Sequence, residues 1–83
     1  MSNNIKVEIK DIHGLHARKC VAICNAANKY ESNIQMSHNG HVVDMKSILG
    51  LLSLACPTGS KVEISAYGAD SEQAIKYLQL LVE

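Results

Sequence analysis

The sequence predicts an α+β fold in which a four-stranded antiparallel sheet carries three helices on one face. Two segments, one near each end of the chain, alternate apolar and polar residues, as strands with one solvated face do. A third segment contains an Asn-Gly hairpin signal, and three further segments show helical spacing. The expected element order is β-α-β-β-α-β-α, in a single domain of residues 1–83.

The two alternating segments, 5–10 and 61–67, repeat an apolar residue at every second position. The apolar positions are Ile5, Val7, Ile9, Val62, Ile64 and Ala66. A period of two sends alternate side chains to opposite faces of a strand. We therefore expect one face of the sheet to pack against a core and the other to meet water.

The segment NIQMSHNGHVVDM (33–45) predicts a β-hairpin. Asn39 and Gly40 form the preferred two-residue turn, because both central positions of that turn need a positive φ. The apolar residues of its two strands are Ile34, Met36, Val42 and Val43.

The remaining segments predict helices. The first, about 17–28, and the third place apolar residues three and four positions apart, on one face. The second, about 47–54, has a serine as its N-cap and ends before Pro57. The third begins at Asp70, with Gln73 at the spacing of a capping box. The apolar positions of the first and third helices are Cys20, Ile23, Cys24, Ala27, Ala74, Ile75, Leu78 and either Leu81 or Val82.

Composition argues against several classes of function. The chain has 83 residues, 47% of them hydrophobic, a formal net charge of zero and neither Phe nor Trp, so binding of nucleic acid is not expected. The stretch MSNNIKVEIK lacks the continuous apolar segment of a secretory signal, and no segment reaches the roughly 18 apolar residues of a membrane span. Three cysteines without a CxxC pair suit thiols kept reduced in a cytosol. We expect a cytoplasmic protein.

The stretch HGLHARKC (13–20) places cations at the start of the first helix. A helix N-terminus carries partial positive charge, so it favours anions and disfavours cations such as Arg18 and Lys19. A phosphoryl group on the ring of His16 would reverse this conflict, because it would meet backbone N–H groups, the helix dipole and both cations. The alternative is that both cations extend into water without a ligand.

Three stretches resemble the HPr family, the histidine-containing phosphocarrier proteins of the phosphoenolpyruvate-dependent sugar phosphotransferase system. GLHAR (14–18) is similar to the family's active-site motif, and KSILGLLSL (46–54) to its regulatory serine and the short helix that follows. VEISAYG (62–68) and the element order agree with the family too. The resemblance covers essentially the whole chain and implies the HPr-like open-faced β-sandwich.

The resemblance implies roles for three residues, His16, Arg18 and Ser47. His16 matches the histidine that accepts phosphate on Nδ1 from enzyme I and passes it to enzyme IIA components of sugar permeases. Arg18 matches the arginine that assists transfer, while Ala17 and Lys19 are expected to contact or modulate the phosphate at the helix start. Ser47 matches the serine that HPr kinase/phosphorylase phosphorylates in some bacteria. The family works as a carrier and not as an enzyme with its own turnover, and we expect no cofactor.

Lys19 departs from the family, which usually has proline at this position. Proline would preset the backbone of the first helical turn without loss of a needed N–H. Lysine lacks that rigidity and adds a mobile positive charge near the expected phosphate. We therefore expect phospho-His16 to be no less stable here than with proline.

The short second helix is apolar almost all round, which an outer helix of a small domain cannot bury completely. Part of it should form an exposed patch of the kind that binds partners. Leu51 and Leu54 suit the core, whereas Ile48, Leu49 and Leu52 suit docking. We expect enzyme I, enzyme IIA domains and HPr kinase/phosphorylase as partners, and a monomer.

Two other interpretations stay open. One is an HPr-like regulatory module that acts mainly through phosphorylation of Ser47 and protein binding, although the serine has a simpler role as an N-cap. The other is a small metal or interaction module. His38 and His41 flank the hairpin turn, but two imidazoles without a third ligand make a weak site. His13 is expected to be a solvated loop residue, and we expect no metal site.

Overall fold

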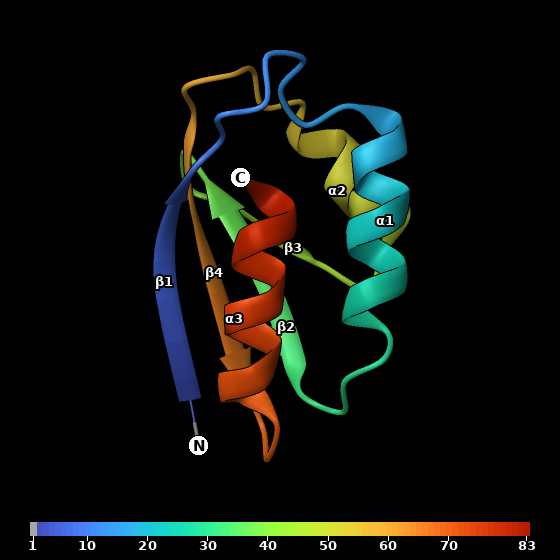
Figure 1. Ribbon diagram of the computed structural model, residues 1–83, viewed down its shortest axis with the longest axis vertical. Coiled ribbons are helices and arrows are strands. Elements are labelled where there is room, and N and C mark those ends of the chain that lie inside the picture. The colour runs from blue at the N-terminus through green and yellow to red at the C-terminus, as the bar shows by residue number, and fades with distance from the viewer. Residues whose placement is uncertain (1) are drawn as a thin grey trace.

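The computed structural model describes residues 2–83 and confirms the predicted fold class (Figure 1). A four-stranded antiparallel sheet carries three helices in the order β-α-β-β-α-β-α. The strands are β1 (Ser2–Glu8), β2 (Asn33–His38), β3 (His41–Asp44) and β4 (Lys61–Tyr67). The helices are α1 (Ala17–Ala27), α2 (Ile48–Leu54) and α3 (Ser71–Val82).

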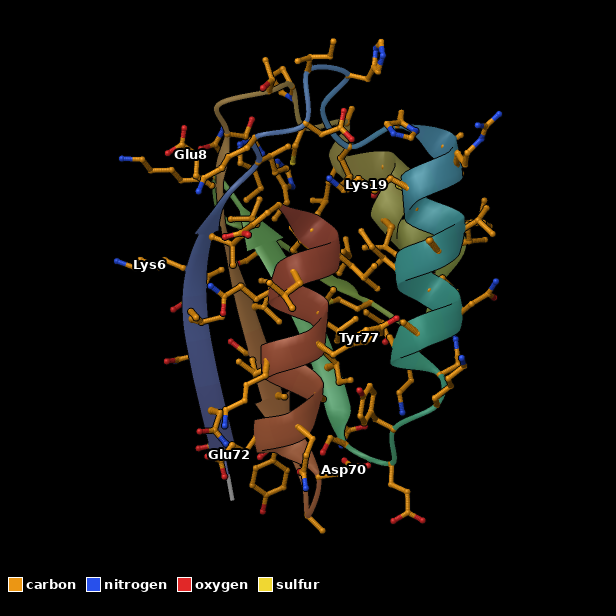
Figure 2. The ribbon with its side chains drawn as sticks, viewed as in Figure 1. Lys6, Glu8, Lys19, Asp70, Glu72 and Tyr77 are labelled. Carbon is orange, nitrogen blue, oxygen red and sulfur yellow. The ribbon has the colours of Figure 1, made fainter. Side chains whose placement is uncertain are left out.

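The strands lie in the order β1-β4-β2-β3, and every neighbouring pair is antiparallel. The period-two prediction is confirmed for β4, because Val62, Ile64 and Ala66 are all buried. In the segment predicted at 5–10, Val7 and Ile9 are buried and Ile5 is half-buried, but β1 ends at Glu8, two residues earlier than predicted. Lys6 and Glu8 of β1 point away from the helices, on the solvated side of the strand (Figure 2).

One core cluster fills the space between the sheet and the helices. Cys20, Ile23 and Ala27 of α1 are fully buried in it, as their spacing predicted. Cys24 lies at its rim, where its thiol donates a hydrogen bond to the Lys46 carbonyl oxygen at 3.2 Å. Of the two residues expected to complete the apolar face of α3, Leu81 or Val82, it is Val82 that is fully buried.

The hairpin between β2 and β3 forms as predicted. Asn39 and Gly40 have φ values of 51° and 82°, the positive values that the two-residue turn requires. His38 and His41 lie opposite each other where the strands leave the turn.

The capping box predicted at Asp70 is wrong, although α3 does begin at the next residue. The Asp70 carboxylate accepts hydrogen bonds from the N–H groups of Glu31 at 2.9 Å and Ser32 at 3.0 Å, and a further one from the Ser32 hydroxyl. Several donors from the loop after α1 thus replace the single N–H of a helix cap. The Ser32 hydroxyl and then the Glu31 N–H lower the pKa of Asp70, which desolvation partly opposes.

No helix within residues 2–83 combines the length and the apolar character needed to cross a membrane.

Candidate functional site

The loop after β1 and the loop after α2 meet at one end of the molecule and form the base of the site (Figure 1). The Leu15 N–H donates a hydrogen bond to the Cys56 carbonyl oxygen at 2.8 Å. Gly14 has a φ of +67°, and a Cβ added there would lie 2.5 Å from the same oxygen. Only glycine allows both this backbone conformation and this close approach.

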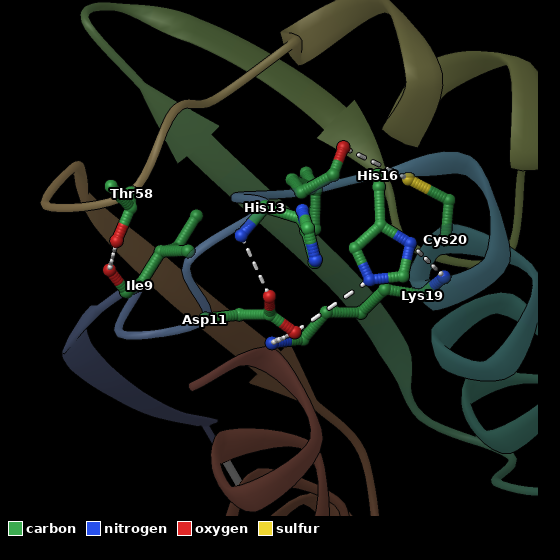
Figure 3. A network of polar contacts seen from close by, with 8 residues as sticks. Ile9, Asp11, His13, His16, Lys19, Cys20 and Thr58 are labelled. Carbon is green, nitrogen blue, oxygen red and sulfur yellow. Dashed lines mark hydrogen bonds and ion pairs between the residues drawn. The ribbon is translucent and has the colours of Figure 1, made fainter.

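His16 is the N-cap of α1, a position more often taken by Ser, Thr, Asp or Asn. Its Nδ1 accepts a hydrogen bond from the Lys19 N–H at 3.3 Å (Figure 3). Because an acceptor nitrogen carries no proton, the proton of the neutral ring is on Nε2. The side chain is 34% exposed, so Nδ1 belongs to a ring that solvent and partners can reach.

The Lys19 N–H also corrects one expectation about the departure from proline. Proline at this position would remove an N–H that this structure uses, because that group caps the helix through His16. The Lys19 side chain is only 12% exposed, and its ammonium lies 3.6 Å from the Asp11 carboxylate. The ammonium is therefore held by a protein carboxylate and is not free in water.

Asp11 joins the site from the loop after β1, and no sequence argument had selected it. Its Oδ2 lies 3.6 Å from His16 Nε2 as well as 3.6 Å from Lys19 Nζ (Figure 3). Its Oδ1 accepts a hydrogen bond from the His13 N–H at 2.9 Å. That hydrogen bond lowers the pKa of Asp11 most, desolvation opposes it, and the charges of Lys19 and His16 lower it further. The available signal was an Asp two residues before a backbone donor, which is typical of an Asx turn.

Arg18 and Ala17 are exposed in the first turn of α1. Within residues 2–83, Arg18 has no ion-pair partner, and the N–H groups of Ala17 and Arg18 have no hydrogen-bond acceptor. The helix start therefore presents a free guanidinium and two free donors next to His16. These are the groups that an anion would need there.

Ser47 is confirmed as the N-cap of α2, since its Oγ accepts a hydrogen bond from the Gly50 N–H at 3.1 Å. The exposed patch of α2 is confirmed too, with Ile48, Leu49 and Leu52 exposed by 37%, 77% and 40%. Leu51 is fully buried, as expected for the core. Phosphorylation at the serine and docking at the patch stay predictions.

The other histidines lie at the surface or near it. His13 is exposed, and its ring stands edge-on to that of His16, with 6.0 Å between the ring centroids. His41 is exposed and His38 is half-buried. In the part of the chain that the structure describes, no three or more His, Cys, Asp or Glu side chains gather as metal ligands do.

The cysteines Cys20, Cys24 and Cys56 are all free thiols. Cys56 belongs to the loop after α2 and is buried, as is Cys20. Burial raises the pKa of both of these thiols, so they are poor nucleophiles at neutral pH.

Comparison with known proteins identifies the family. Residues 4–83 match the family model described as PTS HPr component phosphorylation site. The HPr-like protein Crh of Bacillus subtilis is 37% identical over 78 residues, which cover 94% of this chain and 92% of Crh. The structure of the phosphocarrier protein HPr from Bacillus anthracis has a TM-score of 0.95 and 33% identity, and covers 99% of this chain and 98% of its own. An HPr dimer from Thermoanaerobacter tengcongensis has a TM-score of 0.77 and 40% identity, and covers 94% and 90%. The chain therefore belongs to the HPr family of phosphocarrier proteins.

Proposed function

We propose that this protein carries a phosphoryl group on Nδ1 of His16, which it accepts from an enzyme I and passes to enzyme IIA components of sugar permeases. The observation that supports this most directly is that Nδ1, at the start of α1, accepts the Lys19 N–H on a ring that is one-third exposed. An unprotonated ring nitrogen has the lone pair that a nucleophile needs.

The transfer step needs no proton to leave the ring. The Nδ1 lone pair forms a bond to phosphorus while the bond between phosphorus and the donor breaks, and Nε2 keeps its proton. Nδ1 then no longer accepts the Lys19 N–H, which becomes available to a phosphate oxygen together with the N–H groups of Ala17 and Arg18. The Arg18 guanidinium adds a charge-assisted contact.

The exposed apolar patch on α2 supports a role in docking. Ile48, Leu49 and Leu52 offer an apolar surface for enzyme I, for enzyme IIA domains and for HPr kinase/phosphorylase. We expect the protein to act in the cytoplasm as a phosphoryl carrier without a cofactor. A monomer remains our prediction, although a related HPr has been solved as a dimer.

A phosphorylation assay tests this function. Incubation with phosphoenolpyruvate and enzyme I should place acid-labile phosphate on the wild-type protein and none on His16→Ala. His13→Ala is the matched control, because it removes the neighbouring imidazole and should leave the labelling intact. Failure of the wild type to accept phosphate, or labelling that depends on His13, contradicts the proposal.

A second candidate function is regulation through Ser47. Its hydroxyl lies at the start of α2 beside the exposed patch, and a relative of 37% identity, Crh, is described as the Bacillus subtilis catabolite repression HPr. A phosphate at this position would add negative charge to the docking surface. Acid-stable, ATP-dependent phosphate that appears with HPr kinase/phosphorylase and disappears in Ser47→Ala supports this role. Absence of such labelling rejects it.

A further inference from the structure

We propose that Asp11 is a positioning residue for phosphoryl transfer: its carboxylate keeps the proton of the His16 ring on Nε2 and offsets the positive charge that the ring gains when Nδ1 binds phosphorus. The proposal rests on the carrier function above and adds a residue to its machinery.

The backbone fixes the position of the Asp11 carboxylate. Its Oδ1 accepts the His13 N–H at 2.9 Å, while the main-chain oxygen of Asp11 accepts the Gly14 N–H at 2.9 Å. The Asp11 N–H donates to the Glu83 carbonyl oxygen at 3.0 Å, which ties the loop to the end of α3. Oδ2 is then left to face His16 Nε2 at 3.6 Å. This distance is long for a hydrogen bond but well within the range of attraction between charges.

Two contacts select the same tautomer of the His16 ring. The Lys19 N–H donates to Nδ1, so Nδ1 must be unprotonated. The Asp11 carboxylate beside Nε2 favours a proton on that nitrogen. In the opposite tautomer, an N–H would point at an N–H and a lone pair would face a carboxylate. Asp11 therefore favours the form of the ring in which Nδ1 is nucleophilic.

The charge of the ring changes during transfer. With Nδ1 bonded to phosphorus and Nε2 still protonated, the ring is cationic. A carboxylate near Nε2 stabilises that cation, in the same way as the aspartate of a Ser-His-Asp triad stabilises an imidazolium.

Lys19 belongs to this arrangement because a carboxylate near the reacting atoms also repels an incoming phosphoryl group. The Lys19 ammonium lies 3.6 Å from the same Oδ2 and offsets this repulsion. Lys19, in place of the usual proline, thus offsets the charge of Asp11 through its side chain and donates a hydrogen bond to His16 through its N–H.

The test uses phosphoramidate, a small P–N donor that needs no enzyme I. Its P–N bond breaks, ammonia leaves, and the rate at which phospho-His16 forms is followed by ³¹P NMR. We expect Asp11→Asn to slow this rate about threefold to tenfold, as fits a charge pair that is one-third exposed. Glu72→Gln is the matched control, because it removes the same charge from the opposite end of the molecule and should leave the rate unchanged (Figure 2).

Two variants of Asp11 separate positioning from loop structure. The Asn variant keeps an Oδ1 that accepts the His13 N–H, whereas Asp11→Ala loses both this bond and the charge. If Asp11 only shaped the loop, the Asn variant would react like the wild type and the Ala variant alone would be slow. An Asn variant as fast as the wild type, or faster, therefore overturns the proposal.

Two further measurements complete the test. The ¹⁵N spectrum of the unphosphorylated wild type, taken at a pH where the ring is neutral, should show a protonated Nε2; a proton on Nδ1 overturns the proposal. With enzyme I as donor, Asp11→Asn should lower kcat and leave KM unchanged. A wild type that reacts with phosphoramidate but not with enzyme I refutes the carrier function alone, because the Asp11 comparison does not use enzyme I.

Discussion

Replacement of Gly14 by alanine should destabilise the protein and disturb the site, and Gly59 offers a matched comparison. Both glycines have a positive φ, +67° at Gly14 and +87° at Gly59. A Cβ at Gly59 would meet nothing within 4 Å, whereas one at Gly14 would lie 2.5 Å from the Cys56 carbonyl oxygen and 2.9 Å from the Pro57 Cα. The two substitutions therefore share the backbone strain and differ in the steric clash.

The magnitudes follow from these two components. A left-handed conformation costs an alanine about 1–2 kcal/mol, which applies to both variants. The clash at Gly14 is with backbone atoms that cannot rotate away, so it adds the cost of overpacking, about 1–3 kcal/mol. The gain from a stiffer unfolded chain is common to both and cancels in the comparison. Gly14→Ala should therefore lose about 1–3 kcal/mol more than Gly59→Ala.

Denaturant unfolding followed by circular dichroism measures both free energies, and the phosphorylation assay measures the effect on the site. In a domain of this size, each kcal/mol corresponds to about 4–8 °C in Tm. Since Gly14 lies two residues before His16, the alanine variant should also accept phosphate more slowly. Equal losses of stability in the two variants would show that the contact with Cys56 has no energetic weight, and would refute the reasoning.

Three other predictions follow from the structure. Leu49→Ala should weaken binding to enzyme I several-fold with little loss of stability. The control Leu80→Ala removes a leucine that is 70% exposed on α3 and should change neither the binding nor the stability. Equal weakening of binding in titrations of both variants would contradict a docking patch on α2. The pKa of Asp70 is lowered in the folded protein, so this carboxylate stabilises the fold above about pH 4, and the stabilisation is lost as the pH falls through the folded-state pKa. Unfolding free energies measured from about pH 6 down to about pH 2 should therefore fall less steeply in Asp70→Asn than in the wild type. Lys19→Pro removes both the N–H that would reach the phosphate and the cation beside Asp11, so phospho-His16 should hydrolyse faster in this variant; slower hydrolysis would reject this role for lysine.

The fold could be predicted from the sequence because its signals are local. Alternation in β4 and the Asn39-Gly40 turn depend on neighbouring residues only, and the structure places both as expected. Asp70 was assigned wrongly for the opposite reason: its partner Ser32 lies 38 residues away in the chain, and local spacing carries no information about such a contact.

The site was predicted only in part, for a similar physical reason. His16 stands out through its motif, and Ser47 through its place before a helix. Asp11 lacks a motif, and its approach to His16 depends on how the loop after β1 turns around Gly14. Likewise, loop geometry and not residue type decides that Lys19 forms an ion pair with Asp11, whereas Arg18 has no ion-pair partner within residues 2–83.

The helix cap provided by His16 has a consequence for how the two forms of the protein differ. The Nδ1 atom of His16 both caps the N-terminus of α1 and binds the phosphoryl group. Phosphorylation therefore replaces this nitrogen by phosphate oxygens as the acceptor of the Lys19 N–H. The loaded and empty molecules thereby differ in the rigidity of the first helical turn as well as in charge. Amide hydrogen exchange at this turn should slow on loading, giving a backbone signature by which the occupancy of the carrier can be read.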